Sequence, residues 1–171
     1  MWQIRFKIIY PTLVFTFYIF YTKVICPWGK NLLIQIKIFY VGLTWALINS
    51  WLILPEFNWP IFLISWLFIS ALVLPFDIRD MKSDDVVTFP ILIGIQKTKF
   101  LAYALVFISG LLSISHLDLI FSLCFLLTTI ITFLLIYFSE NDNREAYFSF
   151  LVESCSGLPL LWLFVHWLIN C

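Results

Sequence analysis

Long apolar runs separated by short polar stretches dominate this chain of 171 residues. A helix needs about 20 apolar residues to cross a hydrocarbon core about 30 Å thick, because it rises about 1.5 Å per residue. Six runs are long enough or nearly so: Ile8–Ile25, Leu32–Leu54, Pro60–Phe76, Phe100–Ser115, Leu117–Phe138 and Tyr147–Ile169. Backbone polar groups inside lipid must be satisfied within their own segment, so each run is predicted to be a helix.

Composition agrees with this pattern. Hydrophobic residues make up 63% of the chain and charged residues only 12%, about half the charged share of an average soluble domain. The chain is therefore predicted to be all-α, a polytopic membrane bundle of about six transmembrane helices, with residues 1–171 forming a single domain surrounded by membrane lipid. The formal net charge is zero, so no general field attracts nucleic acid and we expect no nucleic-acid partner.

The first apolar run has two interpretations. Arg5 and Lys7 precede it, as in a secretory signal peptide, whereas the run is rich in Phe and Tyr and no small-residue cleavage site follows. A retained helix is the favoured interpretation. The four cysteines are scattered without CxxC spacing, so the sequence does not predict a metal or dithiol site at them.

Charge asymmetry between the loops predicts an orientation. The loops after the second and fourth runs contain only Glu56 and Asp118 as charged residues. Those after the first, third and fifth runs contain Lys23, Lys30, Arg79, Lys82, Lys97, Lys99 and Arg144. The positive-inside rule places this second set of loops in the cytoplasm.

An acidic stretch follows the third run. Asp77, Asp80 and Asp84 are spaced i, i+3 and i+7, so the three carboxylates share one face if the helix continues through them. Clustered carboxylates suit Mg²⁺, which takes one or two of them and keeps its other positions for water and phosphate. Arg79 and Lys82 lie between the acids and suit phosphate oxygens. The alternative is an ordinary solvated loop of mixed charge.

This stretch carries a family resemblance. The run Asp77-Ile-Arg-Asp80-Met-Lys-Ser-Asp84, followed by Thr88-Phe-Pro-Ile-Leu-Ile-Gly94, resembles the second aspartate-rich motif of the UbiA-type membrane prenyltransferases. That motif has the approximate form D-x-x-D-x-x-x-D and is followed by a T-L-P-like turn, a short apolar run and a glycine. Three apolar runs precede the motif and three follow it, as in the second two-thirds of that fold.

The resemblance implies a function and a site. Members of the family bind a prenyl diphosphate through Mg²⁺ and transfer the prenyl group to an acceptor. In this chain Asp77, Asp80 and Asp84 would be the metal ligands, and Arg79 and Lys82 would contact the diphosphate. It also implies a multi-pass protein of the cell's inner (plasma) membrane with the aspartate loop in the cytoplasm.

The departures from the family pattern leave the activity open. Family members have about nine helices and an earlier N-D-x-x-D-x-x-x-D-like motif, which this sequence lacks, so the chain resembles the last six helices and its catalytic apparatus is expected to be incomplete. A second copy or another protein would then supply the missing helices. The alternatives are a non-catalytic membrane protein that binds isoprenoid or a partner, and a truncated product of a longer prenyltransferase.

One further acid stands out. Glu153 lies within the last apolar run, where a charged side chain costs roughly 3 kcal/mol at the helix centre unless it is paired or hydrated. It resembles an acidic residue that many family members carry in their final helix, and we expect it to face the bundle interior or a cavity. A protonated or water-linked acid without a role remains the alternative.

Overall fold

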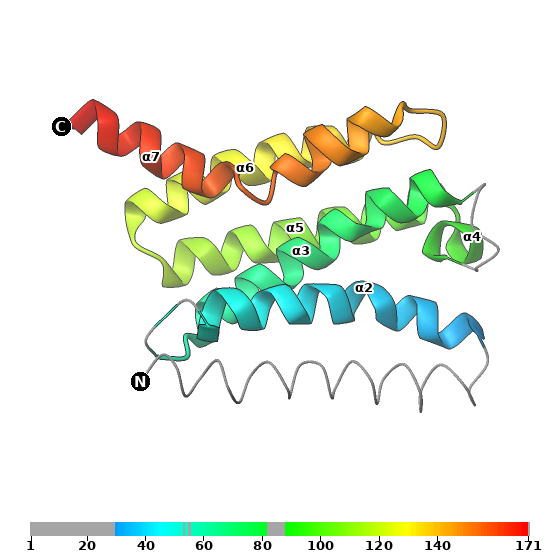
Figure 1. Ribbon diagram of the computed structural model, residues 1–171, viewed down its shortest axis with the longest axis horizontal. Helices are drawn as coiled ribbons and strands as arrows, with labels where there is room; N and C mark the ends of the chain where they lie inside the picture. Colours follow the sequence, from blue (N-terminus) through cyan, green and yellow to red (C-terminus); the bar gives the residue numbers. More distant parts are fainter. Residues whose placement is uncertain (1–29, 53, 55, 82–87, 171) are drawn as a thin grey trace.

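The computed structural model describes residues 30–52, 54, 56–81 and 88–170. The run Ile8–Ile25 and the residues Lys82 and Asp84 lie outside this part. The helices lie side by side and antiparallel in chain order (Figure 1). They are α2 (Lys30–Leu47), η2 (Ile48–Leu52), α3 (Trp59–Asp80), α4 (Phe89–Ile93), α5 (Ile95–His116), α6 (Leu119–Phe138), η3 (Tyr147–Val152) and α7 (Leu158–Asn170). The prediction of an all-helical fold is confirmed, with no strand among the described residues.

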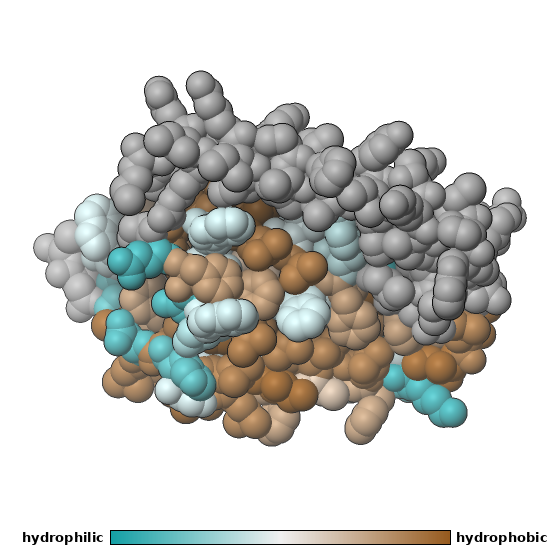
Figure 2. Space-filling model, turned by 90° about the horizontal axis from the view of Figure 1, so that it is seen from below, coloured by the Kyte–Doolittle hydropathy of each residue, from teal (hydrophilic) through white to brown (hydrophobic). Residues whose placement is uncertain are grey.

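Three of these helices, α3, α5 and α6, are long and apolar enough to cross a membrane. Figure 2 shows apolar side chains over the middle of the described surface, with hydrophilic side chains toward its two ends. Large apolar side chains are exposed along α5 and α6, among them Phe107, Leu111 and Leu134. Such a surface is stable against lipid hydrocarbon rather than water, so the chain is a membrane protein.

The helix α3 is central, because α2, α5 and η3 all pack against it. Asn58 caps its first turn by accepting a hydrogen bond from the backbone N–H of Ile61 at 3.0 Å, and Pro60 occupies a first-turn position where no intrahelical N–H is needed. Two groups of buried apolar residues line its two sides. One joins α2, α3, α5 and α6 around Leu74 and Val106, and the other joins α3, α6 and η3 around Phe68 and Phe148.

Close packing between α2 and α3 depends on a glycine. A Cβ atom on Gly42 would lie 2.2 Å from the Ser70 hydroxyl and 2.9 Å from the backbone oxygen of Trp66. The Trp66 indole N–H donates a hydrogen bond to the carbonyl of Phe39 at 2.9 Å, which ties the same two helices together. The missing side chain at residue 42 therefore lets α3 sit against α2.

A turn after residue 88 leads into α5. The apolar run that follows Thr88 is a short helix, α4, which ends at Gly94. Gly94 has φ +85°, a conformation that glycine adopts without steric cost. Lys97 and Lys99, which the sequence placed in a loop, lie instead in the first turns of α5.

The last apolar run is not one helix. η3 begins at Tyr147, and α7 ends the described chain at Asn170, but Cys155–Gly157 between them form a turn. Backbone N–H groups of these three residues donate to carbonyls three positions earlier, at 3.0–3.2 Å. Gly157 and Pro159 explain the interruption, since both residue types disfavour a continuous helix. Figure 1 shows α7 leaving the line of η3 at this turn.

Candidate functional site: an apolar groove below the aspartate end of α3

The aspartate end of the bundle is the last turn of α3. The helix continues through Asp77 and Asp80, so these two carboxylates are one turn apart along it, as their spacing predicted. The Asp77 side chain is 3% exposed, whereas that of Asp80 is 28% exposed. The structure therefore places one predicted ligand inside the bundle and the other at its surface.

Arg79 is held rigidly at this end. Its Nε donates to Asp80 Oδ1 at 2.5 Å and its Nη2 donates to Asp80 Oδ2 at 2.9 Å. The guanidinium also lies over two aromatic rings, 5.3 Å from the centre of Phe76 and 5.9 Å from that of Phe148. The first ring belongs to α3 and the second to η3. A planar cation fixed in this way is well suited to an anionic oxygen group that approaches from outside.

The two predicted ligands in the described part of the chain are carboxylates, the kind of donor that a hard cation prefers. Asp77 and Asp80 offer carboxylate oxygens, and Mg²⁺ takes one or two of these while it retains water and phosphate oxygens. Asp84, the third predicted ligand, and Lys82, the second predicted diphosphate contact, lie outside the described residues. Within the described ranges, no group of three or more His, Cys, Asp and Glu side chains is positioned to hold a metal ion.

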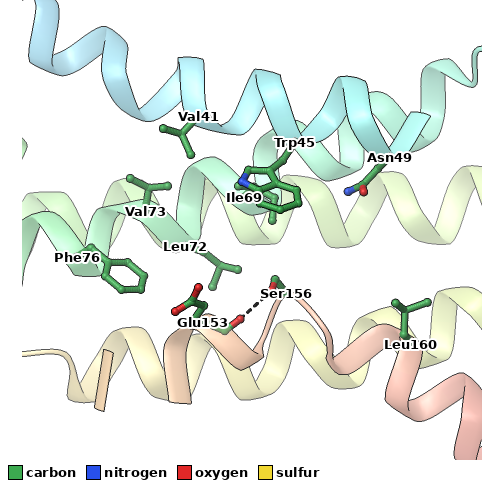
Figure 3. Close-up of a pocket in the computed structure, with 10 residues that line it drawn as sticks. All are labelled: Val41, Trp45, Asn49, Ile69, Leu72, Val73, Phe76, Glu153, Ser156 and Leu160. Carbon is green, nitrogen blue, oxygen red and sulfur yellow. Dashed lines mark hydrogen bonds between the residues drawn. The ribbon is translucent and has the colours of Figure 1, made fainter. Parts of the chain in front are cut away.

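An apolar groove begins directly below this end. A cavity of about 410 Å³ has α3 as its floor, with α2 on one side and the η3–α7 segment on the other (Figure 3). Its α3 lining is Ile69, Leu72, Val73 and Phe76, which follow the i, i+3, i+4, i+7 spacing of one helix face. Asp80, four residues after Phe76, continues the same stripe. The acidic end of α3 therefore lies at the top of the groove.

The groove extends along most of α3. A second cavity, of about 330 Å³, shares Asn49, Ile69, Ser156 and Leu160 with the first and reaches Ile61 near the start of the helix. From Phe76 to Ile61 is about 22 Å at a rise of about 1.5 Å per residue. This shape can hold a long, narrow apolar molecule beside α3.

Sequence reasoning missed most of this groove. It identified Glu153, which lines the first cavity as expected, but not its neighbours Asn49, Ser156 and Trp45. The Gly157 and Pro159 signals could have located the turn that brings Ser156 to the groove. The Asn49 Nδ2 donates a hydrogen bond to Ser65 Oγ of α3 at 3.4 Å, which joins the end of the α2–η2 segment to α3.

The described structure thus defines a helical membrane protein with an apolar groove that ends at a charged pair. No family model, curated protein or solved structure matches this chain.

Proposed function

We propose that this protein is a UbiA-like membrane protein that binds a prenyl diphosphate, with the diphosphate at the aspartate end of α3 and the isoprenoid chain in the groove. The observation that carries the proposal is the continuous α3 stripe from Ile69 through Phe76 to Asp80, in which an apolar lining ends at a carboxylate. A prenyl diphosphate has the same distribution of apolar and charged parts. The resemblance of the aspartate stretch to the family motif supports the same ligand.

In this proposal Asp77, Asp80 and Asp84 hold Mg²⁺, which supplies positive charge to the diphosphate oxygens. Arg79 meets a diphosphate oxygen directly, and its contacts with Phe76 and Phe148 keep the guanidinium in place. A carboxylate has about four lone-pair sites, so Asp80 can face Mg²⁺ while it remains paired with Arg79. The apolar lining of the groove keeps the isoprenoid chain of the ligand away from water.

The proposed orientation puts the aspartate end in the cytoplasm of a plasma-membrane protein. Arg79 is in the last turn of α3, Lys99 is in the first turns of α5, and Arg144 is in the connection after α6. These parts of the chain lie at the end of the bundle that holds α4 (Figure 1). The connections at the other end contain only acidic charges among the described residues, Glu56 and Asp118. This asymmetry supports the assignment under the positive-inside rule.

The binding proposal is tested by calorimetry of the purified protein in detergent with farnesyl diphosphate, with and without Mg²⁺. Asp80→Asn is expected to weaken Mg²⁺-dependent binding at least tenfold, while Asp118→Asn, a matched change at the opposite end of the bundle, leaves it unchanged. Equal affinity of the parent and Asp80→Asn for the ligand would show that the aspartate end is not part of the binding site. Binding that does not depend on Mg²⁺ would show that the metal has no part in the site.

Prenyl transfer by this chain alone is not part of the proposal. Departure of diphosphate develops negative charge, and removing one well-placed electrostatic partner typically lowers such rates about 10²- to 10³-fold. The family site uses two aspartate motifs, whereas this sequence contains one. We therefore propose isoprenoid binding without turnover unless a second copy or a partner completes the site. Turnover of labelled farnesyl diphosphate with Mg²⁺ and aromatic acceptors by the monomeric protein, lost in Asp77→Ala, would contradict this.

A further inference from the structure

We propose that Glu153, together with Asn49 and Ser156, forms a second binding site inside the groove. Its ligand is a lipid-soluble molecule whose polar end donates hydrogen bonds, through a hydroxyl or an ammonium group. The inference rests on the polar groups of the groove and on the interrupted last helix. It does not depend on diphosphate binding at the aspartate end.

The first argument is the position of the helix interruption. Glu153 immediately follows η3, and Ser156 lies in the turn before α7. Ser156 lines both cavities together with Ile69, which lies near the middle of α3. Non-helical backbone at membrane depth is stable only where it is buried in protein or lines a cavity. The interruption thus delivers polar groups to the middle of an apolar groove.

A second interruption of regular α-helix faces the first. Asn49 belongs to the π-helical segment η2, and Glu153 directly follows the π-helical segment η3. Single π-helical turns are uncommon and often occur at functional sites. Figure 3 shows Asn49 and Glu153 entering the groove from its opposite walls.

The polar atoms of this site are mainly acceptors. One of the two amide N–H groups of Asn49 donates to Ser65 Oγ, and its carbonyl oxygen remains for a ligand. The Ser156 hydroxyl donates to the Glu153 carbonyl at 2.8 Å, so its lone pairs remain. An ionised Glu153 adds two acceptor oxygens. A ligand that satisfies these groups must bring donors.

The charge of Glu153 also favours a ligand that donates hydrogen bonds. Glu153 is the one ionisable side chain among the residues that line the first cavity. Within the described part of the chain, its carboxylate forms no ion pair. A charge at membrane depth without a partner is unfavourable, and a ligand donor group would offset that cost.

The surroundings select the rest of the ligand. Leu72, Val73 and Phe76 give the groove an apolar floor around Glu153, and the Trp45 ring lies on the facing wall. Trp45 is 52% exposed and Leu160 is 72% exposed, so the groove opens sideways toward lipid. A molecule dissolved in the membrane can enter without crossing water.

The test uses three matched probes, each a sixteen-carbon chain with a diazirine, that end in an amine, an alcohol or a methyl ether. The full protein is reconstituted in phosphatidylcholine nanodiscs, illuminated, and mapped by mass spectrometry. A hydrogen bond to a charged group is worth about 1.5–3 kcal/mol, or roughly tenfold to a hundredfold in affinity. The amine or the alcohol is therefore expected to label residues 153–160 at least tenfold more than the ether, and the stronger of the two identifies the donor.

Glu153→Gln should reduce this labelling at least tenfold, whereas Glu145→Gln, a change at an exposed position just before η3, should not. Equal labelling by all three probes, or full labelling of Glu153→Gln, would overturn the proposal and leave an apolar groove only. If Glu153→Gln does not fold, the comparison of the three probes on the parent protein decides alone. Loss of diphosphate binding in Asp80→Asn leaves these outcomes unchanged, so the two proposals fail separately.

Discussion

Lys99 extends from the first turns of α5 to the end of α6, where its Nζ donates a hydrogen bond to the carbonyl of Tyr137 at 2.7 Å. The side chain is 7% exposed. Carbonyls in the last turn of a helix have no intrahelical partner and carry partial negative charge. Lys99 therefore caps the C-terminal end of α6 and joins this helix to α5 at the aspartate end of the bundle.

Replacing this lysine should destabilise the protein. Lys99→Met keeps the aliphatic stem but leaves the Tyr137 carbonyl without its donor, and we expect a loss of about 1–3 kcal/mol in the free energy of unfolding. Lys97→Met, at an exposed position two residues earlier, is the control and should have little effect. Unfolding in mixed micelles with increasing dodecyl sulfate measures both. Equal stability of the two variants would show that the buried bond contributes nothing.

The contact at Gly42 predicts a second difference in stability. Gly42→Ala would push a methyl group against Ser70 Oγ and the fixed backbone oxygen of Trp66, and such overpacking costs about 1–3 kcal/mol. Gly110→Ala is the matched control, because the nearest atom, in Leu126, would lie 3.7 Å from its Cβ. Thermal unfolding in detergent should show a lower midpoint for the first variant only. A midpoint for Gly42→Ala as high as that of the parent would mean that α2 is free to shift.

Orientation can be tested by cysteine labelling in intact cells. In a chain whose four native cysteines are replaced by Ala, a cysteine introduced at Glu56 should react with an impermeant maleimide from outside. A cysteine introduced at Glu145 should react only after the membrane is permeabilised, since the positive-inside rule places the loop after α6 in the cytoplasm. Labelling of both from the same side would refute the antiparallel arrangement across the membrane.

The length of the groove should determine which isoprenoid chain lengths the protein prefers to bind. Leu160 lines both cavities and its side chain is 72% exposed, so Leu160→Trp narrows the groove without disturbing the buried core. We expect this variant to weaken Mg²⁺-dependent binding of farnesyl diphosphate about tenfold and to leave that of dimethylallyl diphosphate unchanged, because only the longer chain reaches this level. Calorimetry with both ligands measures the ratio. An equal change for the two ligands would place the isoprenoid chain elsewhere.

The helices themselves could be predicted because apolar runs of membrane length have few alternatives to helix. The run Leu117–Phe138 matches α6 to within two residues. The break after Glu153 was missed because residues on both sides of it are equally apolar. Lys99 was assigned to a loop because its charge suggests solvent, whereas its long stem lets the amine reach a carbonyl from a buried position.

The site was only partly predictable for a related reason. The i, i+3 placement of Asp77 and Asp80 follows from helix geometry alone. The groove does not, because it arises where α2 and the η3–α7 segment both lie against α3, and no local pattern encodes that juxtaposition. The position of Asn49 opposite Glu153 likewise depends on packing between segments about a hundred residues apart.

The contact of Arg79 with the Phe148 ring ties only the first part of the last apolar run to the aspartate end of α3. The part before the turn is anchored to the aspartate end through Phe148 and is held by α3. The part after it, α7, packs against α6. The turn at Cys155–Gly157 therefore separates a part of the run that is tied to α3 from a part that is tied to α6. The width of the groove beside α7 and the geometry of the aspartate end therefore depend on different packing contacts, so a substitution in one part need not alter the other.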